Sequence, residues 1–294
     1  MRPDHAILFV LLLSGCVGEN PPPEPAADYP SLGRTAFDPP TKGILHMTFD
    51  DGPSSLYTRD IVDTLVKHHV PATFFVVGNN IAGRRDLLDY ERDQGMQIGN
   101  HSYYHEVQST LTEGLFKHRT AATRVNIGDR DKGRLYYRFP YGAAGEDQMR
   151  WLEKELDLDG KHYKAVGWNM DSQDWDFGKN YPTQEQSDAI VPADEQCGGV
   201  PNPFQDDMLG WVQFLTRRDG GGVILFHDTT PITHDKLDAI LTYLESPTQY
   251  WKSLDEAPER KQKYERYYQC RGVDASLTFK FEPLYSGSWP SFVR

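Results

Sequence analysis

Two adjacent carboxylates, Asp50 and Asp51, end a strand-like run and are followed at once by Gly52 and Pro53 in the segment HMTFDDGPSS. Asp-Gly-Pro is ordinary turn chemistry, so the triplet could simply reverse the chain. Two neighbouring aspartates that are both buried and ionised repel each other, however, and need a neutralising partner. The functional interpretation is that a cation binds one carboxylate while the other stays ionised and accepts a proton.

Two histidines, His101 and His105, lie four residues apart in HSYYH. One helical turn or a tight loop would place both imidazoles on the same side. Two imidazoles and one carboxylate make a site for a divalent transition metal that leaves positions open for water. The spacing alone arises by chance on helices. Its combination with an aspartate at another strand end favours a metal site over a surface or core role.

Arg138 ends a further strand-like run, in RFPYG. An arginine beside Asp50 would keep that carboxylate ionised and fix its orientation through a bidentate pair. The alternative is a surface ion pair.

His227, in LFHD, is a candidate general acid. Asp171 or Asp174, in DSQDW, could hold its imidazole ring and raise its pKa. Taken separately, Trp175 and Leu225 are typical of core residues.

The sequence around these residues alternates between continuous apolar runs, typical of buried strands, and amphipathic stretches of helical period. The patterns predict strands at 43–49, 72–78, 96–101, 134–139, 163–169 and 222–228, and helices at 57–69, 84–95, 110–128, 145–157, 206–217 and 234–246. This alternation implies a parallel sheet covered by helices, and six or seven such units favour a barrel over an open sheet. Working residues of such sheets gather at the carboxyl ends of the strands, which is where every candidate falls.

The remaining composition narrows the class of function. The 294-residue chain has a formal net charge of -12, and clustered Lys and Arg are needed to bind a nucleic-acid backbone, so no nucleic-acid partner is expected. No Gly-rich phosphate loop follows a strand, which disfavours dinucleotide binding. Residues 176–205 are polar and rich in Gly and Pro, and they predict a long loop or insertion.

The N-terminal segment MRPDHAILFVLLLSGC contains an apolar run of roughly ten residues, too short to span a bilayer and typical of a signal peptide at 1–15. Its end resembles the lipobox of bacterial lipoproteins, which implies that Cys16 is lipidated; an ordinary cleaved signal is the alternative. A Pro-rich tether then extends to residue 42. Because Val17 and not Asp follows the lipobox cysteine, the resemblance points to the outer membrane.

Cys197 and Cys270 would then lie in an oxidising compartment, where they are expected to form a disulfide, unless they are two unrelated buried thiols.

The segments TFDDGP, HSYYH, RFPYG, DSQDW and LFHD, in this order, resemble the motifs of the NodB-like polysaccharide deacetylases, carbohydrate esterase family four. The resemblance covers 43–247 and implies a distorted (β/α)7 barrel, with an aromatic-rich C-terminal extension at 248–294 packed on it. The resemblance also implies the following roles: Asp50 as catalytic base with Arg138 as its partner; Asp51, His101 and His105 as metal ligands; the backbone N–H of Tyr141 as oxyanion donor; Trp175 and Leu225 as walls of the acetyl pocket; and His227 as acid. Phe139 stands where the family often has Pro, and the interval from Asp174 to His227 is long for the family.

By this resemblance we expect one divalent ion, zinc or alternatively Co, Ni or Mn, and hydrolysis of N-acetyl groups on a polysaccharide that contains N-acetylglucosamine. Peptidoglycan is the favoured substrate, because an anchor in the outer membrane facing the periplasm would hold the domain beside it. The tyrosines and tryptophan in the motif segments (Tyr103, Tyr104, Tyr141 and Trp175) suit stacking on sugar rings. Chitin, poly-N-acetylglucosamine and acetylated xylan are the alternatives. A non-catalytic sugar-binding lipoprotein is disfavoured because each catalytic position holds a competent residue.

Overall fold

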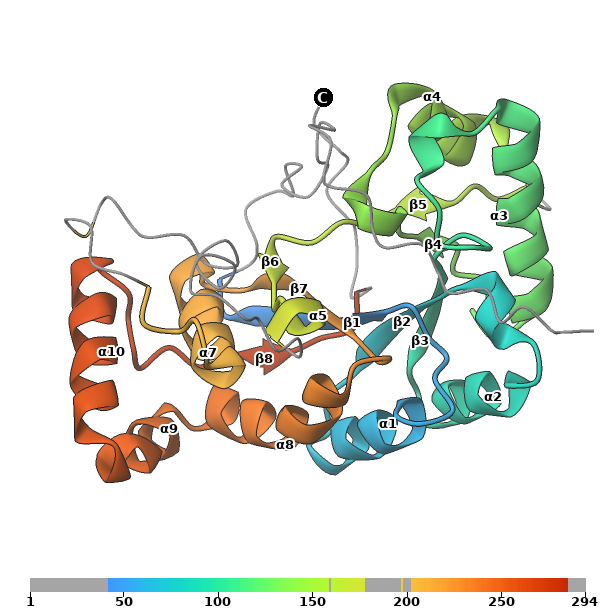
Figure 1. Ribbon diagram of the computed structural model, residues 1–294. Coiled ribbons are helices and arrows are strands. Elements are labelled where there is room, and N and C mark those ends of the chain that lie inside the picture. Colours follow the sequence, from blue (N-terminus) through green and yellow to red (C-terminus); the bar gives the residue numbers. More distant parts are fainter. Residues whose placement is uncertain (1–41, 159, 178–196, 198–201, 285–294) are drawn as a thin grey trace, which may run out of the picture.

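The computed structural model describes residues 42–158, 160–177, 197 and 202–284 (Figure 1). Several expectations lie outside the described residues: the signal peptide at 1–15, lipidation of Cys16, nearly all of the tether, and most of the 176–205 segment.

A curled parallel sheet forms the centre of the molecule (Figure 1). Its main path runs in the order β5-β4-β3-β2-β1-β7-β6, and all of its strand pairs are parallel. The strands are β1 (Ile44–Asp50), β2 (Ala72–Val76), β3 (Gln97–Asn100), β4 (Tyr136–Tyr137), β5 (Lys164–Ala165), β6 (Met170–Asp171) and β7 (Gly222–His227). The curled seven-strand path confirms the expected distorted (β/α)7 architecture.

Helices follow the strands and cover the outside of the sheet, with α1, α2 and α8 along its lower side in Figure 1. They are α1 (Thr58–Lys67), α2 (Arg85–Asp93), α3 (Glu113–Ile127), α4 (Glu146–Arg150), a π-helical turn (Trp151–Glu155), α5 (Asp174–Phe177), α7 (Met208–Asp219) and α8 (Pro231–Glu245). Seven of these eight segments coincide with the six helices that periodicity predicts, since α4 and the π-helical turn both lie within 145–157. The short α5 was not expected.

The single strand expected at 163–169 is wrong. That segment enters β5 at one end of the sheet path and then crosses to β6 at the other end. The backbone N–H of Val166 still donates to Tyr137, but the carbonyls of Val166 and Gly167 accept hydrogen bonds from the Arg138 guanidinium. Because these carbonyls are taken by a side chain, the strand ladder ends there.

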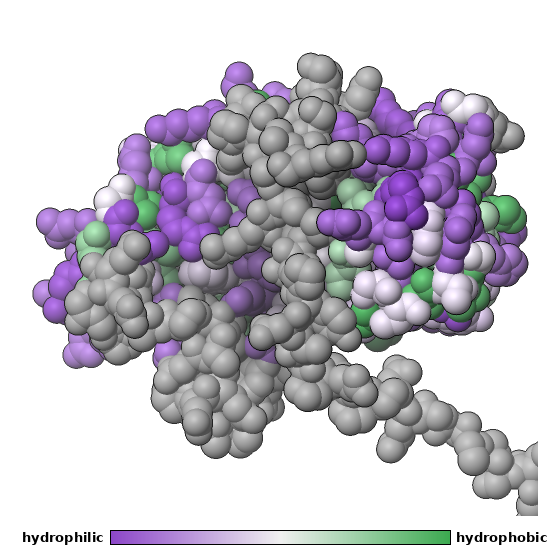
Figure 2. Space-filling model, turned by 90° about the horizontal axis from the view of Figure 1, so that it is seen from above, coloured by the Kyte–Doolittle hydropathy of each residue, from purple (hydrophilic) through white to green (hydrophobic). Residues whose placement is uncertain are grey.

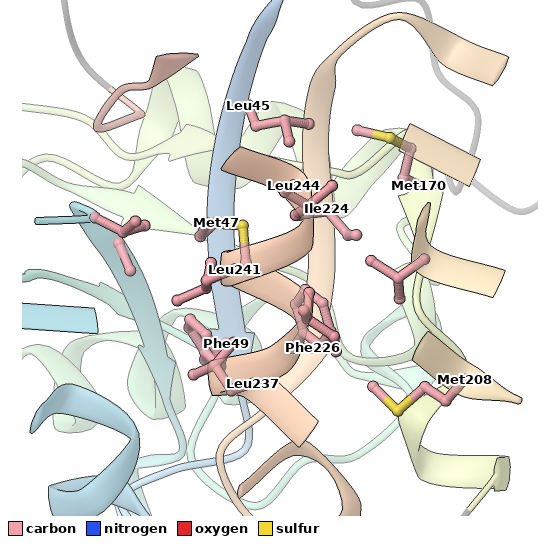
Figure 3. Close-up of a cluster of buried hydrophobic side chains, with 14 of the residues drawn as sticks. Leu45, Met47, Phe49, Met170, Met208, Ile224, Phe226, Leu237, Leu241 and Leu244 are labelled. Carbon is pink, nitrogen blue, oxygen red and sulfur yellow. The ribbon is translucent and has the colours of Figure 1, made fainter. Parts of the chain in front are cut away.

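The two faces of the central strands carry different residues. Leu45, Met47 and Phe49 of β1 point with Ile224 and Phe226 of β7 into an apolar core against α8 (Figure 3). Burying one such side chain stabilises the fold by about 1.5–3 kcal/mol. Since side chains alternate along a strand, the intervening residues of β1 and β7 lie on the inner face of the half-barrel. The candidate site residues of β1 and β7 lie on that inner face.

The C-terminal part adds elements that the sequence patterns do not predict: α9 (Pro247–Ser253), α10 (Pro258–Cys270) and β8 (Lys280–Phe281), which pairs with the start of β1. Tyr264, Tyr267 and Tyr268 of α10 pack on Phe204, which precedes α7. A disulfide bond joins Cys197 to Cys270, with a Cα–Cα distance of 5.8 Å.

On the face seen in Figure 2, the visible described residues are largely hydrophilic, with hydrophobic side chains in small separate patches. Of the helices that the structure describes, none is both long enough and apolar enough to cross a membrane.

Candidate active site

Strands β1 and β7 together carry the residues at the centre of the site. In their parallel pairing Asp50 lies opposite His227, and Thr48 opposite Leu225. Asp50 is the last residue of β1 and is only 2% exposed. The inner face of the sheet therefore brings a carboxylate and an imidazole together at the carboxyl ends of neighbouring strands.

Asp51 leaves the strand in a left-handed conformation, with φ of 76°. A non-glycine residue in that region typically costs about 1–3 kcal/mol and persists where surrounding contacts hold it. Here Asn80 donates a hydrogen bond to the Asp51 carbonyl at 2.8 Å. Ser102 and His105, in the segment that faces Asp51, also have positive φ, of 66° and 57°. The backbone strain is thus concentrated where side chains converge.

Asp51, His101 and His105 present ligand atoms that all lie within 4.8 Å of one another. The Nε2 atoms of His101 and His105 are 3.4 Å and 3.1 Å from Asp51 Oδ1. Ligand atoms at about 2.0–2.1 Å from a tetrahedral zinc ion stand about 3.3 Å apart, so these separations match a metal site.

Two further observations fit a bound cation. Asp51 Oδ1 is buried and has no hydrogen-bond partner among the described residues, although orphaned buried oxygens are costly. His101 Nδ1 lies 2.8 Å from the carbonyl of Arg138, which fixes the ring so that Nε2 faces Asp51. Burial opposes ionisation of Asp51, but the neighbouring imidazoles of His101 and His105 outweigh it and hold its pKa below the usual range.

Arg138 is completely buried and holds Asp50. Its Nη1 donates to Asp50 Oδ1 and to Thr48 Oγ1, both at 2.8 Å. The contact to Asp50 is one hydrogen bond rather than the expected bidentate pair, because Nε and Nη2 donate to the Val166 and Gly167 carbonyls. Asp50 Oδ2 remains directed at the metal cluster, 3.5 Å from His101 Nε2.

His227 is held by Asp174, the first residue of α5. Its Nδ1 and its backbone N–H donate to the two Asp174 oxygens at 2.7 Å and 2.6 Å. Burial disfavours the charged imidazole, but Asp174 outweighs it and raises the pKa of His227 to about 10. The Nε2 atom lies on the metal side, 4.0 Å from Asp51 Oδ2. Of the two aspartates left open by the sequence, Asp174 is the one that holds the ring.

The other expected site residues lie around this centre. Asp171, in β6, accepts from the Gln173 backbone N–H at 2.8 Å, and burial raises its pKa to about 6. Leu225 is buried two residues before His227 on the same face of β7, whereas Trp175 is half-exposed on α5. Tyr141 adopts φ of 59°, and its ring packs edge-on against His105 at 4.6 Å.

Further residues, which the sequence patterns did not indicate, contact the site residues and hold them in place. The hydroxyls of Thr230 and Thr233 both donate to Asp174 Oδ2. Asp228 is fully buried and accepts a hydrogen bond from the Thr58 hydroxyl. Its carboxylate also explains Gly52, because a Cβ there would lie 2.3 Å from Asp228 Oδ2. Because Asp228 directly follows His227 in the LFHD segment, its position in the sequence could have identified it as a residue of the site.

Comparisons with known proteins agree with the motifs. Residues 38–160 match the polysaccharide deacetylase family model. The chain is 26% identical over 217 residues to the peptidoglycan-N-acetylglucosamine deacetylase of Listeria monocytogenes, across 74% of this chain and 39% of that protein. It is 31% identical over 133 residues to the chitooligosaccharide deacetylase of Bradyrhizobium sp., across 45% of this chain and 58% of that protein. It therefore spans less than two thirds of the length of either relative.

A solved structure, a family 4 carbohydrate esterase from Streptomyces lividans in complex with acetate, has the same fold. The TM-score is 0.51 at 28% sequence identity, with 71% of this chain and 89% of that chain covered. The five motif segments, the curled parallel sheet and the family match all point to the same relatives. Over residues 38–160 the chain is similar to the polysaccharide deacetylases, and its fold is that of a family 4 carbohydrate esterase.

Proposed function

We propose that this chain hydrolyses N-acetyl groups on N-acetylglucosamine units of a polysaccharide, using one bound divalent ion. The observation that carries the proposal is the meeting of three groups at one end of the sheet. These are the metal-ligand cluster around Asp51, the buried Asp50 held by Arg138, and the imidazole of His227 held by Asp174.

Asp51, His101 and His105 would hold the ion, and a carboxylate with two imidazoles suits zinc, with Co, Ni or Mn as alternatives. When bound, such an ion supplies Lewis acidity, which polarises the acetyl carbonyl and makes a water molecule more acidic.

Asp50 acts as the base. Because Arg138 occupies Oδ1, the free oxygen is Oδ2, on the side of His101. This oxygen accepts the proton of the attacking water as the new C–O bond forms at the acetyl carbon. The hydrogen bond from Arg138 also fixes the orientation of the buried carboxylate. The backbone N–H of Tyr141, in its left-handed turn beside His105, donates to the oxyanion that develops on the carbonyl oxygen.

His227 acts as the acid. Its Nδ1 is taken by Asp174, so Nε2 delivers a proton to the amide nitrogen as the C–N bond breaks. The products are acetate and a free amine on the sugar, and the proton taken by Asp50 restores His227 for the next cycle. An ion held by Asp51, His101 and His105 would oppose the positive charge of the protonated ring and so favour the release of its proton.

Among N-acetylated glycans we favour peptidoglycan. The Listeria relative is named for that substrate and the Bradyrhizobium relative for chitooligosaccharides, and both substrates contain N-acetylglucosamine. The test is acetate release measured side by side from purified sacculi, chitin oligomers, poly-N-acetylglucosamine and acetylated xylan. The fastest release is expected from sacculi. Faster release from chitin oligomers would contradict peptidoglycan as the substrate. A clear preference for acetylated xylan would contradict the proposal that the chain hydrolyses N-acetyl groups.

We also propose that the chain is anchored by a lipid on Cys16 and faces the periplasm from the outer membrane. The support is the lipobox-like segment and the Pro-rich tether that follows it. The anchor would hold the catalytic domain within reach of the cell wall.

A further inference from the structure

The tyrosines near the metal cluster differ in what their rings contact. The Tyr141 ring packs on His105, and its hydroxyl donates to the His105 carbonyl at 3.3 Å. The Tyr103 ring packs over Gly78, where an added Cβ would lie 2.8 Å from Tyr103 Cδ2. Tyr104 is 57% exposed, although it directly precedes a ligating histidine. A large aromatic ring left open beside a reactive site is a candidate ligand contact.

The exposed Tyr104 ring is nevertheless held in place. Its backbone N–H donates to Glu106 Oε2 at 3.1 Å, and the other oxygen of Glu106 accepts from Arg119 Nη1 at 2.9 Å. The Arg119 guanidinium lies 5.2 Å from the centre of the Tyr104 ring. The Tyr103 ring packs edge-on against the Tyr104 ring, with 4.6 Å between the two ring centres. An ion pair, a cation–π contact and a neighbouring ring therefore orient one open aromatic surface before any ligand arrives.

We propose that Tyr104 is a glycan-binding residue that stacks on the sugar next to the one being deacetylated, an inference that rests on the proposed function. N-acetylglucosamine in a β-linked chain carries equatorial substituents, so its ring presents an apolar C–H face. The electron-rich face of an aromatic ring attracts such C–H groups. Neighbouring Cα atoms are about 3.8 Å apart, so a sugar on Tyr104 lies beside the metal cluster rather than over it. The site thus selects an oligomer over a single sugar.

The test uses penta-N-acetylchitopentaose with the metal-loaded protein. The Tyr104→Ala variant is expected to raise KM and the Kd from calorimetric titration by roughly three- to tenfold, with kcat within about twofold of the parent. Tyr104→Phe keeps the aromatic face and is expected to behave like the parent. Arg119→Met, which removes the cation that orients the ring, should raise KM in the same direction but by less.

Tyr90→Ala is the matched control, because Tyr90 is another tyrosine with an arginine over its ring, Arg59 at 4.1 Å, but lies on α2 away from the metal cluster. It should leave KM and Kd unchanged. Unchanged Kd and KM in Tyr104→Ala would overturn the inference, as would an equal loss in Tyr104→Phe. If the parent binds the pentamer through Tyr104 but releases no acetate, the proposed function fails and the binding role stands. If the parent does not bind the pentamer, the binding role fails.

Discussion

Replacing Asp174 by Asn removes the charge that keeps a proton on His227. In the parent, Asp174 overcomes the burial of the imidazole and raises the pKa of His227 to about 10. Without that charge, burial still lowers the pKa of His227 while the charges of Asp51 and Asp50 still raise it, so the pKa falls towards its ordinary value. At the ordinary value of about 6.5 the imidazole is only about one-tenth protonated at pH 7.5.

Because His227 acts in its protonated form, activity is lost as pH rises through its pKa. The lower pKa in Asp174→Asn therefore moves this loss to lower pH. At pH 7.5 we expect kcat/KM to fall by about tenfold if the pKa of His227 reaches its ordinary value, and by up to about 10²–10⁴-fold if acid catalysis is lost entirely. The assay is the pH profile of acetate release, with metal content and thermal unfolding measured on the same samples.

Asp171→Asn is the matched control, since Asp171 is a buried neighbouring carboxylate whose described hydrogen bond goes to Gln173 rather than to His227. It should change the basic side of the profile far less. A parent-like profile in Asp174→Asn would refute the reasoning. A larger shift in Asp171→Asn would show that the wrong aspartate has been assigned to His227.

Three other predictions test separate parts of the structure. His101→Ala should lose the bound divalent ion while the fold is kept, as measured by elemental analysis and circular dichroism; an undiminished metal content would exclude His101 as a ligand. Cys270→Ser opens a disulfide that spans 73 residues and should lower the free energy of unfolding by about 4 kcal/mol in the loop-entropy model, measured by urea denaturation. An unchanged free energy of unfolding in that variant would argue against a stabilising bond to Cys197. Cys16→Ala should release the protein from membranes into the soluble periplasmic fraction, and its retention on membranes would place any anchor elsewhere.

The core of the fold was predictable because its signal is local. The apolar runs around Phe49 and Phe226 identify buried strands, and the helices between them carry a clear period. The break within 163–169 was not predictable, because it depends on the guanidinium of Arg138 reaching backbone carbonyls almost thirty residues further on, a separation of 28 or 29. Helix α10 was missed because it is strongly charged, and its buried face consists of tyrosines that pack on the distant Phe204.

The candidate site followed from one regularity, the position of each reactive residue just after a strand. Parallel strands bring such residues to one edge whatever their separation in sequence. Sequence spacing could not tell which aspartate binds His227, nor that the Thr230 and Thr233 hydroxyls hold that aspartate. These are contacts between segments more than fifty residues apart, and only the folded chain brings them together.

The most direct test of the account is acetate release from penta-N-acetylchitopentaose and sacculi by three samples: chelator-treated protein, the same protein after addition of zinc, and zinc-loaded Asp50→Asn. The account predicts no release after chelation and restored release with zinc. It also predicts that Asp50→Asn keeps a full complement of metal but is about 10²–10⁴-fold slower, because the ligands stay and the proton acceptor is lost. Continued release by metal-free protein, or parent-like release by Asp50→Asn, would contradict a metal-dependent deacetylase with Asp50 as its base.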